Sequence, residues 1–196
     1  AHLYERYLTN TKDVEVTDRL IEALILTMKT EVPKVMANLE DYEARANILW
    51  AGMVAHNNVV GVGRSQDWTS HQIEHELSAL YDCAHGAGLA VTMPAVFTYN
   101  MSHDVMRFAQ IAVRVWGCQM DFANPERTAK EGIEALRSFL ISIGMPKNFE
   151  ELGAKEEDIE KLAYTCCYGK GNEGGRIGGF VSLEQKDVEA IYKLML

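Results

Sequence analysis

Apolar residues recur at intervals of three or four along nearly all of the 196-residue sequence, which is the period of an α-helix. No segment shows the strict alternation of a β-strand, and no internal repeat is present. The expected helices span residues 14–39, 42–63, 68–82, 86–100, 104–117, 126–143, 155–167 and 183–194. The sequence therefore predicts an all-α fold, a compact multi-helix domain, and its length suits one such domain.

Capping residues and helix breakers refine these boundaries. Pro33 should kink or split the helix at 14–39, for which Thr17 or Asp13 is a plausible N-cap. Thr69 or Asp67 is the expected cap of the helix at 68–82. The other start and stop signals are Asp104, Asn124 with Pro125, Ser182, Gly117 and Gly144.

Three further segments carry expectations about organisation. Residues 42–63 are rich in small and apolar side chains, so we expect a central buried helix. The same composition fits burial against a partner, such as the second copy in a homodimer. Residues 145–153 are predicted to be a helix–helix connector. Residues 1–10 are amphipathic from the first position with no cap before them, so we expect the natural polypeptide to continue upstream.

A glycine-rich stretch at 168–180 contains the pattern G-x-G-x-x-G at Gly169, Gly171 and Gly174. A dinucleotide-binding loop needs a strand before this pattern and a helix start directly after it. Here a helix precedes the pattern and more loop follows, so we interpret the stretch as a surface connector. Nothing in residues 1–196 resembles a nucleotide-binding unit.

Charge and cysteine content restrict the possible partners and the compartment. The formal net charge of -9 argues against binding to nucleic acid and to an anionic membrane surface. No apolar run reaches the roughly 18 residues of a membrane helix. The four cysteines form no CxxC pair and two of them are adjacent, which favours reduced thiols. We expect a cytoplasmic protein.

Residues 70–86 hold three of the six histidines. His71 and His75 lie four apart, on one face of a helix, where such a pair can chelate one ion. On an unbroken helix His71 and His85 would be separated by about 21 Å of rise, too far for both to bind one metal at about 2.0–2.1 Å. If both bind one ion, the chain must turn just before His85, which would then begin a new helix.

Two sets of ligands follow from this spacing, and the spacing does not choose between them. In the first set, His71-x-x-Glu74-His75 is the zinc motif of a metallopeptidase, with Glu74 as general base. In the second set, His71 and His85 bind the metal, and His75 stands beside it without binding.

The other three histidines carry weaker signals. His56 lies on an apolar helix and is predicted to be a hydrogen-bonded residue of the core or of a groove. His103, next to the expected cap Asp104, is predicted to lie on the surface. His2 has no local motif.

Residues 67–99 resemble the histidine-rich signature of the iron-containing, group III alcohol dehydrogenases, and the NAD(P)H-dependent butanol dehydrogenases are the most similar subgroup. The positions that carry the signature are His71, His75, Leu77, His85, Gly86 and Pro94. The similarity extends over the whole chain. It implies the dehydroquinate synthase-like C-terminal helical domain of that family, so that residues 1–196 are the metal-binding domain and an N-terminal nucleotide-binding domain is absent from this chain.

The resemblance also implies a set of site residues. The family's metal ligands fall on His2, His71 and His85, and a fourth ligand, an aspartate, would lie four positions before His2, outside this chain. His75 takes the place of a catalytic histidine that does not bind the metal and lies near the nicotinamide. Glu74 is then expected to be a residue of the helix surface.

The implied activity is metal-assisted hydride transfer between NAD(P)H and a small alcohol or aldehyde, with Fe²⁺ or Zn²⁺ as the metal. The absent domain would bind most of the cofactor, so the chain alone is expected to be inactive. The alternatives are a zinc metallopeptidase and a non-catalytic helical metal-binding module.

Overall fold

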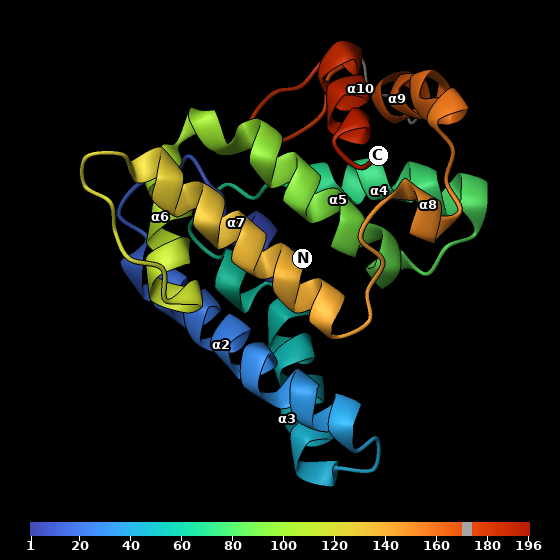
Figure 1. Cartoon of the computed structure of the whole chain (residues 1–196). Coiled ribbons are helices and arrows are strands. Elements are labelled where there is room, and N and C mark those ends of the chain that lie inside the picture. Colours follow the sequence, from blue (N-terminus) through green and yellow to red (C-terminus); the bar gives the residue numbers. More distant parts are fainter. Residues whose placement is uncertain (170–173) are drawn as a thin grey trace.

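The computed structural model describes residues 1–169 and 174–196, and these form an arrangement of packed helices (Figure 1). The elements are α1 (His2–Tyr7), α2 (Glu15–Ala37), α3 (Tyr42–His56), η1 (Val59–Gly61), α4 (Thr69–Tyr81), α5 (His85–Asn100), η2 (Met101–His103), α6 (Val105–Ile111), η3 (Ala112–Trp116, a π-helix), α7 (Pro125–Ser142), α8 (Phe149–Leu152), η4 (Glu156–Asp158), α9 (Ile159–Tyr168) and α10 (Gln185–Lys193). The extended pairing within the described residues is limited to one antiparallel bridge, between Ile177 and Leu183. The all-α prediction is confirmed.

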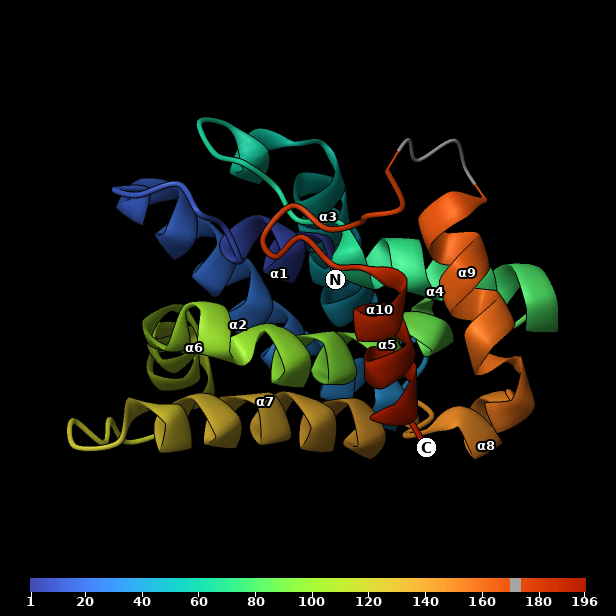
Figure 2. The same ribbon diagram turned by 90° about the horizontal axis from the view of Figure 1, so that it is seen from above.

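Helix α5 lies at the centre of the domain, between α7 and α10 in Figure 1. Every residue from Gly88 to Phe97 is buried, because α4, α7 and α10 pack around this helix. A helix that is apolar on all sides is stable only where neighbours cover every face. Figure 2 shows α7 running along one side of the domain below α5.

The prediction of a central buried helix at 42–63 is wrong. Helix α3 ends at His56 and packs on α2 through a narrow face that buries Ala44 and Ala51. On its other side, Leu49 is 78% exposed and Trp50 is 68% exposed. Apolar composition predicted burial, but it does not indicate which apolar helix occupies the centre, and α5 holds that place.

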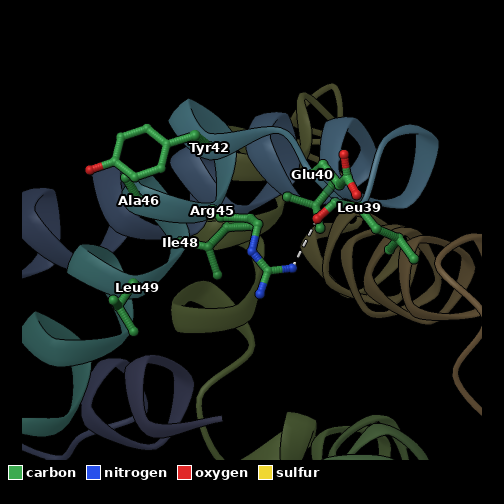
Figure 3. Close-up of a pocket in the computed structure, with 8 residues that line it drawn as sticks. Leu39, Glu40, Tyr42, Arg45, Ala46, Ile48 and Leu49 are labelled. Atoms are coloured by element: carbon green, nitrogen blue, oxygen red, sulfur yellow. Dashed lines mark hydrogen bonds between the residues drawn. The ribbon is translucent and has the colours of Figure 1, made fainter.

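Helices α2 and α3 form a hairpin that projects from the rest of the domain (Figure 1). A hollow of about 740 Å³ lies at its tip, lined by residues of both helices and of their connection, and Arg45 Nη1 donates a hydrogen bond of 3.0 Å to the carbonyl oxygen of Leu39 there (Figure 3). The side chains around the hollow are largely apolar. The hairpin therefore presents an apolar surface to solvent in this chain.

The beginning of α2 and its proline differ from the sequence prediction. The N-cap is Val14, with no side-chain hydrogen bond, so neither Thr17 nor Asp13 caps the helix. Pro33 lies inside α2, which continues to Ala37 and is not split. Proline removes one backbone donor. The helix nevertheless continues past Pro33, and α2 packs against α3.

Several other helix ends can be compared with their predicted signals. Helix α4 follows Trp68 and has no side-chain cap, because Asp67 instead accepts a hydrogen bond from the Thr69 hydroxyl. Asp104 caps α6 as predicted, and its side chain accepts from the backbone N–H of Arg107. The predicted connector at 145–153 contains the short helix α8.

The last helix has a different start from the one predicted. Glu184 and Asp187 form a capping box at α10, so Ser182 is not its cap. Of the G-x-G-x-x-G pattern, Gly171 lies outside the described residues. Gly169 follows the end of α9, and among residues 174–196 the helix begins at Gln185, which agrees with a connector and not with a dinucleotide loop.

Two expectations about the chain as a whole can be compared with the described residues. None of the helices there combines the length and apolar character needed to cross a membrane. All four cysteines, Cys83, Cys118, Cys166 and Cys167, are free thiols, in agreement with the prediction.

Candidate metal centre

Four histidines meet at the junction of α1, α4 and α5: His2 of α1, His71 and His75 of α4, and His85 of α5. The ring centroids of His2 and His71 are 4.5 Å apart, and those of His71 and His85 are 5.3 Å apart. His75 lies 5.4 Å from His85 and 6.1 Å from His71. The fold thus brings together the four histidines singled out by the resemblance.

The predicted turn between His71 and His85 is present. Helix α4 ends at Tyr81, and Asp82 adopts the left-handed conformation with a φ of 51°. This reverses the chain within three residues, and His85 is the first residue of α5. The turn removes the separation of about 21 Å that a continuous helix would impose.

His71 is held by a carboxylate from α1. Glu5 is fully buried; one of its oxygens accepts the backbone N–H of His71 at 3.1 Å, and the other accepts the ring Nδ1–H in a short contact. A carboxylate can only accept here, so the Nδ1 of His71 carries the proton. His71 Nε2 is buried and has no hydrogen-bond partner. A buried acceptor of this kind has the chemistry of a metal-ligating nitrogen.

His85 has a similar partner within α4. Its Nδ1 contacts Oε2 of Glu74, and Oε1 of the same carboxylate accepts a hydrogen bond from the Ser78 hydroxyl. Glu74 is fully buried, so the expectation that it lies on the helix surface is wrong. Gly88 makes room for this carboxylate, because a Cβ at that position would overlap it.

A second possible set of ligands overlaps the first. Within the described residues, Glu74, His75 and His85 have potential ligand atoms within 4.8 Å of one another. Both oxygens of Glu74 are already engaged, by Ser78 and by His85. Metal binding by Glu74 would break these contacts. This favours a supporting role for Glu74, with His2, His71 and His85 as the candidate ligands.

Burial holds His2 in its neutral form. Burial, together with the neighbouring His71, lowers the pKa of His2 from 6.5 to about 4. A histidine binds a metal only as the neutral imidazole, so the environment of His2 keeps the ring ready for ligation near neutral pH.

Two aromatic residues flank His2. The ring of His56 lies 4.9 Å from the ring of His2, and the Trp68 ring lies 5.6 Å from His2 and 5.3 Å from His71. His56 is exposed and is therefore not a residue of the core, and its place in a groove stays a prediction. His103 is exposed, as predicted, and its Nε2 lies 2.8 Å from Oδ1 of Asn10.

Sequence reasoning missed some of the residues that build this centre. Glu5 lies three positions after His2, on the same face of a helix, and this spacing could have identified it. Trp68 and Arg6, whose guanidinium lies 5.3 Å from the Trp68 ring centroid, carry no local motif. Arg6 also donates to the carbonyl oxygen of Ala55, near the end of α3, so it ties α1 to that helix.

Comparison with known proteins identifies the family of this chain. The sequence profile of the "Fe-containing alcohol dehydrogenase family, C-terminal" matches residues 1–196. The chain belongs to the iron-containing alcohol dehydrogenases. The resemblance first seen in the histidine signature is confirmed over the full length, and neither a metallopeptidase nor an unrelated metal-binding module is favoured.

Relatives within this family are named for alcohol and aldehyde chemistry. The probable NADH-dependent butanol dehydrogenase 1 of Bacillus subtilis is 34% identical over 196 residues, which are 100% of this chain and 49% of that protein. The NADPH-dependent aldehyde reductase YqhD of Escherichia coli is 31% identical over 162 residues, 83% of this chain and 41% of that protein. The chain therefore spans about half the length of these relatives.

A solved structure in the family has the same fold. The NADH-dependent butanol dehydrogenase A of Thermotoga maritima superposes with a TM-score of 0.92 at 34% identity. The superposition covers 99% of this chain and 49% of the Thermotoga chain. The helical domain described here is thus the C-terminal domain of the iron-containing alcohol dehydrogenase fold.

Proposed function

We propose that residues 1–196 are the metal-binding domain of an NAD(P)H-dependent enzyme that interconverts primary alcohols and aldehydes. The family membership and the names of the relatives support this activity. The observation that carries the proposal is the buried, unpartnered Nε2 of His71, which lies in a cluster with the rings of His2 and His85. Such a cluster of imidazoles is a suitable site for a divalent transition metal.

His2, His71 and His85 would hold Fe²⁺ or Zn²⁺, both of which imidazole ligands accept. A fourth ligand, an aspartate, would come from a longer polypeptide, which would also supply a nucleotide-binding domain for NAD(P)H. The greater length of the relatives supports this two-domain arrangement. The bound metal supplies a Lewis acid for the substrate oxygen.

His75 is the proposed catalytic residue. It is exposed, and its ring stacks on His85 with an angle of 26° between the planes. From this position its ring nitrogens can exchange a proton with water on the side where substrate and nicotinamide would meet. We assign it the relay of that proton or the orientation of the nicotinamide.

The test compares this chain with a polypeptide that is extended upstream by the missing domain. Both are incubated with butyraldehyde and NADH or NADPH after loading with Fe²⁺ or Zn²⁺, and oxidation of the nicotinamide is followed by absorbance. We expect turnover by the longer polypeptide and none by residues 1–196. Robust turnover by residues 1–196 would contradict the need for the second domain, and a folded, metal-loaded longer polypeptide without turnover on any primary aldehyde would contradict the function.

A further inference from the structure

We infer that Glu5 is a positioning residue whose carboxylate selects the metal-binding tautomer of His71, and that glutamine cannot take its place. The carboxylate of Glu74 faces His85 in a comparable way, but its surroundings allow glutamine to do the same work. This inference rests on the metal site of the proposed function and concerns two residues to which that function assigns no role.

Glu5 receives two hydrogen bonds from the same residue. Its Oε1 accepts the backbone N–H of His71 at 3.1 Å, and its Oε2 accepts the ring Nδ1–H. Its carbonyl oxygen also accepts the backbone N–H of Asp67 at 2.8 Å. Glu5 is fully buried, and His71 is 6% exposed, so water cannot replace either carboxylate contact. Both oxygens of Glu5 must therefore act as acceptors.

A glutamine at position 5 has only one acceptor oxygen. The backbone N–H of His71 is a fixed donor, so it would take that oxygen and leave the NH₂ group facing Nδ1. The ring could satisfy this donor only by accepting at Nδ1, which moves its proton to Nε2. A protonated Nε2 cannot bind a metal, and the alternative placement leaves two buried donors in contact.

Glu74 has different neighbours. Its Oε2 contacts His85 Nδ1, and its Oε1 accepts from the Ser78 hydroxyl, which can donate or accept. Ser78 Oγ also lies 3.3 Å from the carbonyl oxygen of Cys83. With glutamine at position 74, the amide NH₂ could donate to Ser78, and the hydroxyl could turn its proton to Cys83. The amide oxygen would still accept from His85, so the tautomer of His85 would be kept.

The first measurement needs no metal. In protein labelled with ¹⁵N-histidine, long-range ¹H–¹⁵N spectra distinguish the Nδ1–H from the Nε2–H tautomer of each ring. We expect the Nδ1–H tautomer at His71 in the unsubstituted chain and the Nε2–H tautomer in Glu5→Gln, whereas His85 should keep Nδ1–H in Glu74→Gln. An Nε2–H tautomer at His71 in the unsubstituted chain would overturn the inference, even if Glu5→Gln fails to fold.

The second measurement is the affinity for Zn²⁺, by competition with a chromophoric chelator. We expect Glu5→Gln to bind about 10- to 100-fold more weakly and Glu74→Gln to lose clearly less. Glu22→Gln is the matched control: Glu22 is a buried carboxylate whose partners are Tyr7, Arg19 and Arg114, and it should leave Zn²⁺ affinity unchanged.

The outcomes separate this inference from the function. If the unsubstituted chain is folded and binds no Zn²⁺, the metal site of the proposed function fails, and the tautomer spectra still decide the role of Glu5. If the chain binds Zn²⁺ and folded Glu5→Gln binds it equally well, the inference fails and the metal site stands. Circular dichroism of each variant establishes that it is folded.

Discussion

The two histidines of α4 at the candidate metal centre, His71 and His75, lie four residues apart but differ in their surroundings. His71 is buried and directs an unpartnered nitrogen into the cluster, whereas His75 is exposed. In the longer polypeptide we expect His71→Ala and His85→Ala each to lose both bound metal and activity. His75→Ala should keep its metal and lose about 10²- to 10⁴-fold in rate, the usual effect of removing a group that transfers protons.

Metal content by mass spectrometry and turnover with butyraldehyde test these three variants together. Loss of metal in His75→Ala with retention in His85→Ala would favour the ligand set Glu74, His75 and His85. His103→Ala is the control, because that histidine is exposed and contacts Asn10 and Phe180 instead of the metal centre.

The contribution of Tyr99 to stability should change only at high pH. A hydrogen bond from its hydroxyl to the Asp187 carboxylate, together with burial, raises the pKa of Tyr99 from 10.0 to about 12. The unfolded chain ionises first as pH rises. The stabilisation is therefore complete below pH 10 and is lost as pH rises from 10 to about 12.

The Tyr99 prediction is checked by following tyrosinate absorbance against pH in the unsubstituted chain and in Tyr99→Phe. The difference between the two curves isolates the ionisation of Tyr99. A midpoint near the ordinary tyrosine value would contradict the proposed hydrogen bond between α5 and α10.

Among the helices, one buried carboxylate ties α2 to two other parts of the chain. Asp18 accepts hydrogen bonds from Arg64 and Arg107, and the Arg64 side chain is fully buried. Asp18→Asn would leave these two guanidinium groups without a counter-charge. Breaking a buried pair in this way costs about 3–5 kcal/mol, so we expect a loss of that order in the free energy of unfolding.

Urea unfolding followed by circular dichroism measures this loss. Glu15→Gln on the same helix is the control, because its carboxylate is exposed and pairs with the exposed Arg19 and the partly exposed Arg114, and it should change stability little. Equal stability of Asp18→Asn and Glu15→Gln would show that the buried network does not stabilise the fold.

Much of this helical architecture could be predicted from the sequence, because the period of apolar residues and signals such as Asp104 act within a few residues. The reversal before His85 was predicted on the condition that His71 and His85 bind one ion, since a helix cannot bring residues fourteen apart to one ion. The position of α5 at the centre could not be predicted in this way. It depends on which helices pack around it, and 42–63 has a similarly apolar composition.

Less of the candidate site than of the helical architecture could be predicted from the sequence. His2 was found through the family resemblance and not through local spacing. Glu5 and Glu74 are charged residues that ordinarily lie on the surface, and only the packing of α1 on α4 and of α5 on α4 reveals that both are buried against histidines. The partners of a ligand depend on tertiary contacts, which local patterns do not encode.

For the domain as a whole, the exposed apolar face of the α2–α3 hairpin should contribute little to the stability of this chain. Leu49 is 78% exposed, so Leu49→Lys should change the free energy of unfolding by no more than about 0.5 kcal/mol. The same substitution should lower binding of a hydrophobic dye, because it interrupts an apolar surface. Dye fluorescence and urea unfolding measure the two effects.

Leu77→Ala provides the contrast. Leu77 is fully buried in α4, and its truncation should cost about 2–5 kcal/mol. A large loss of stability in Leu49→Lys, comparable with that of Leu77→Ala, would mean that the hairpin face is buried in solution.

Because of the hydrogen bonds of Glu5 to Asp67 and His71, the geometry of the candidate metal centre should not depend on the length of the α2–α3 hairpin. They join α1 directly to the start of α4, so that the chain enters and leaves the hairpin of α2 and α3 at two segments held together by hydrogen bonds. Residues 38–40 form a turn at the far end of the hairpin, and lengthening a surface connection costs little entropy. A change of chain length at this turn should therefore leave the proposed metal ligands in their positions.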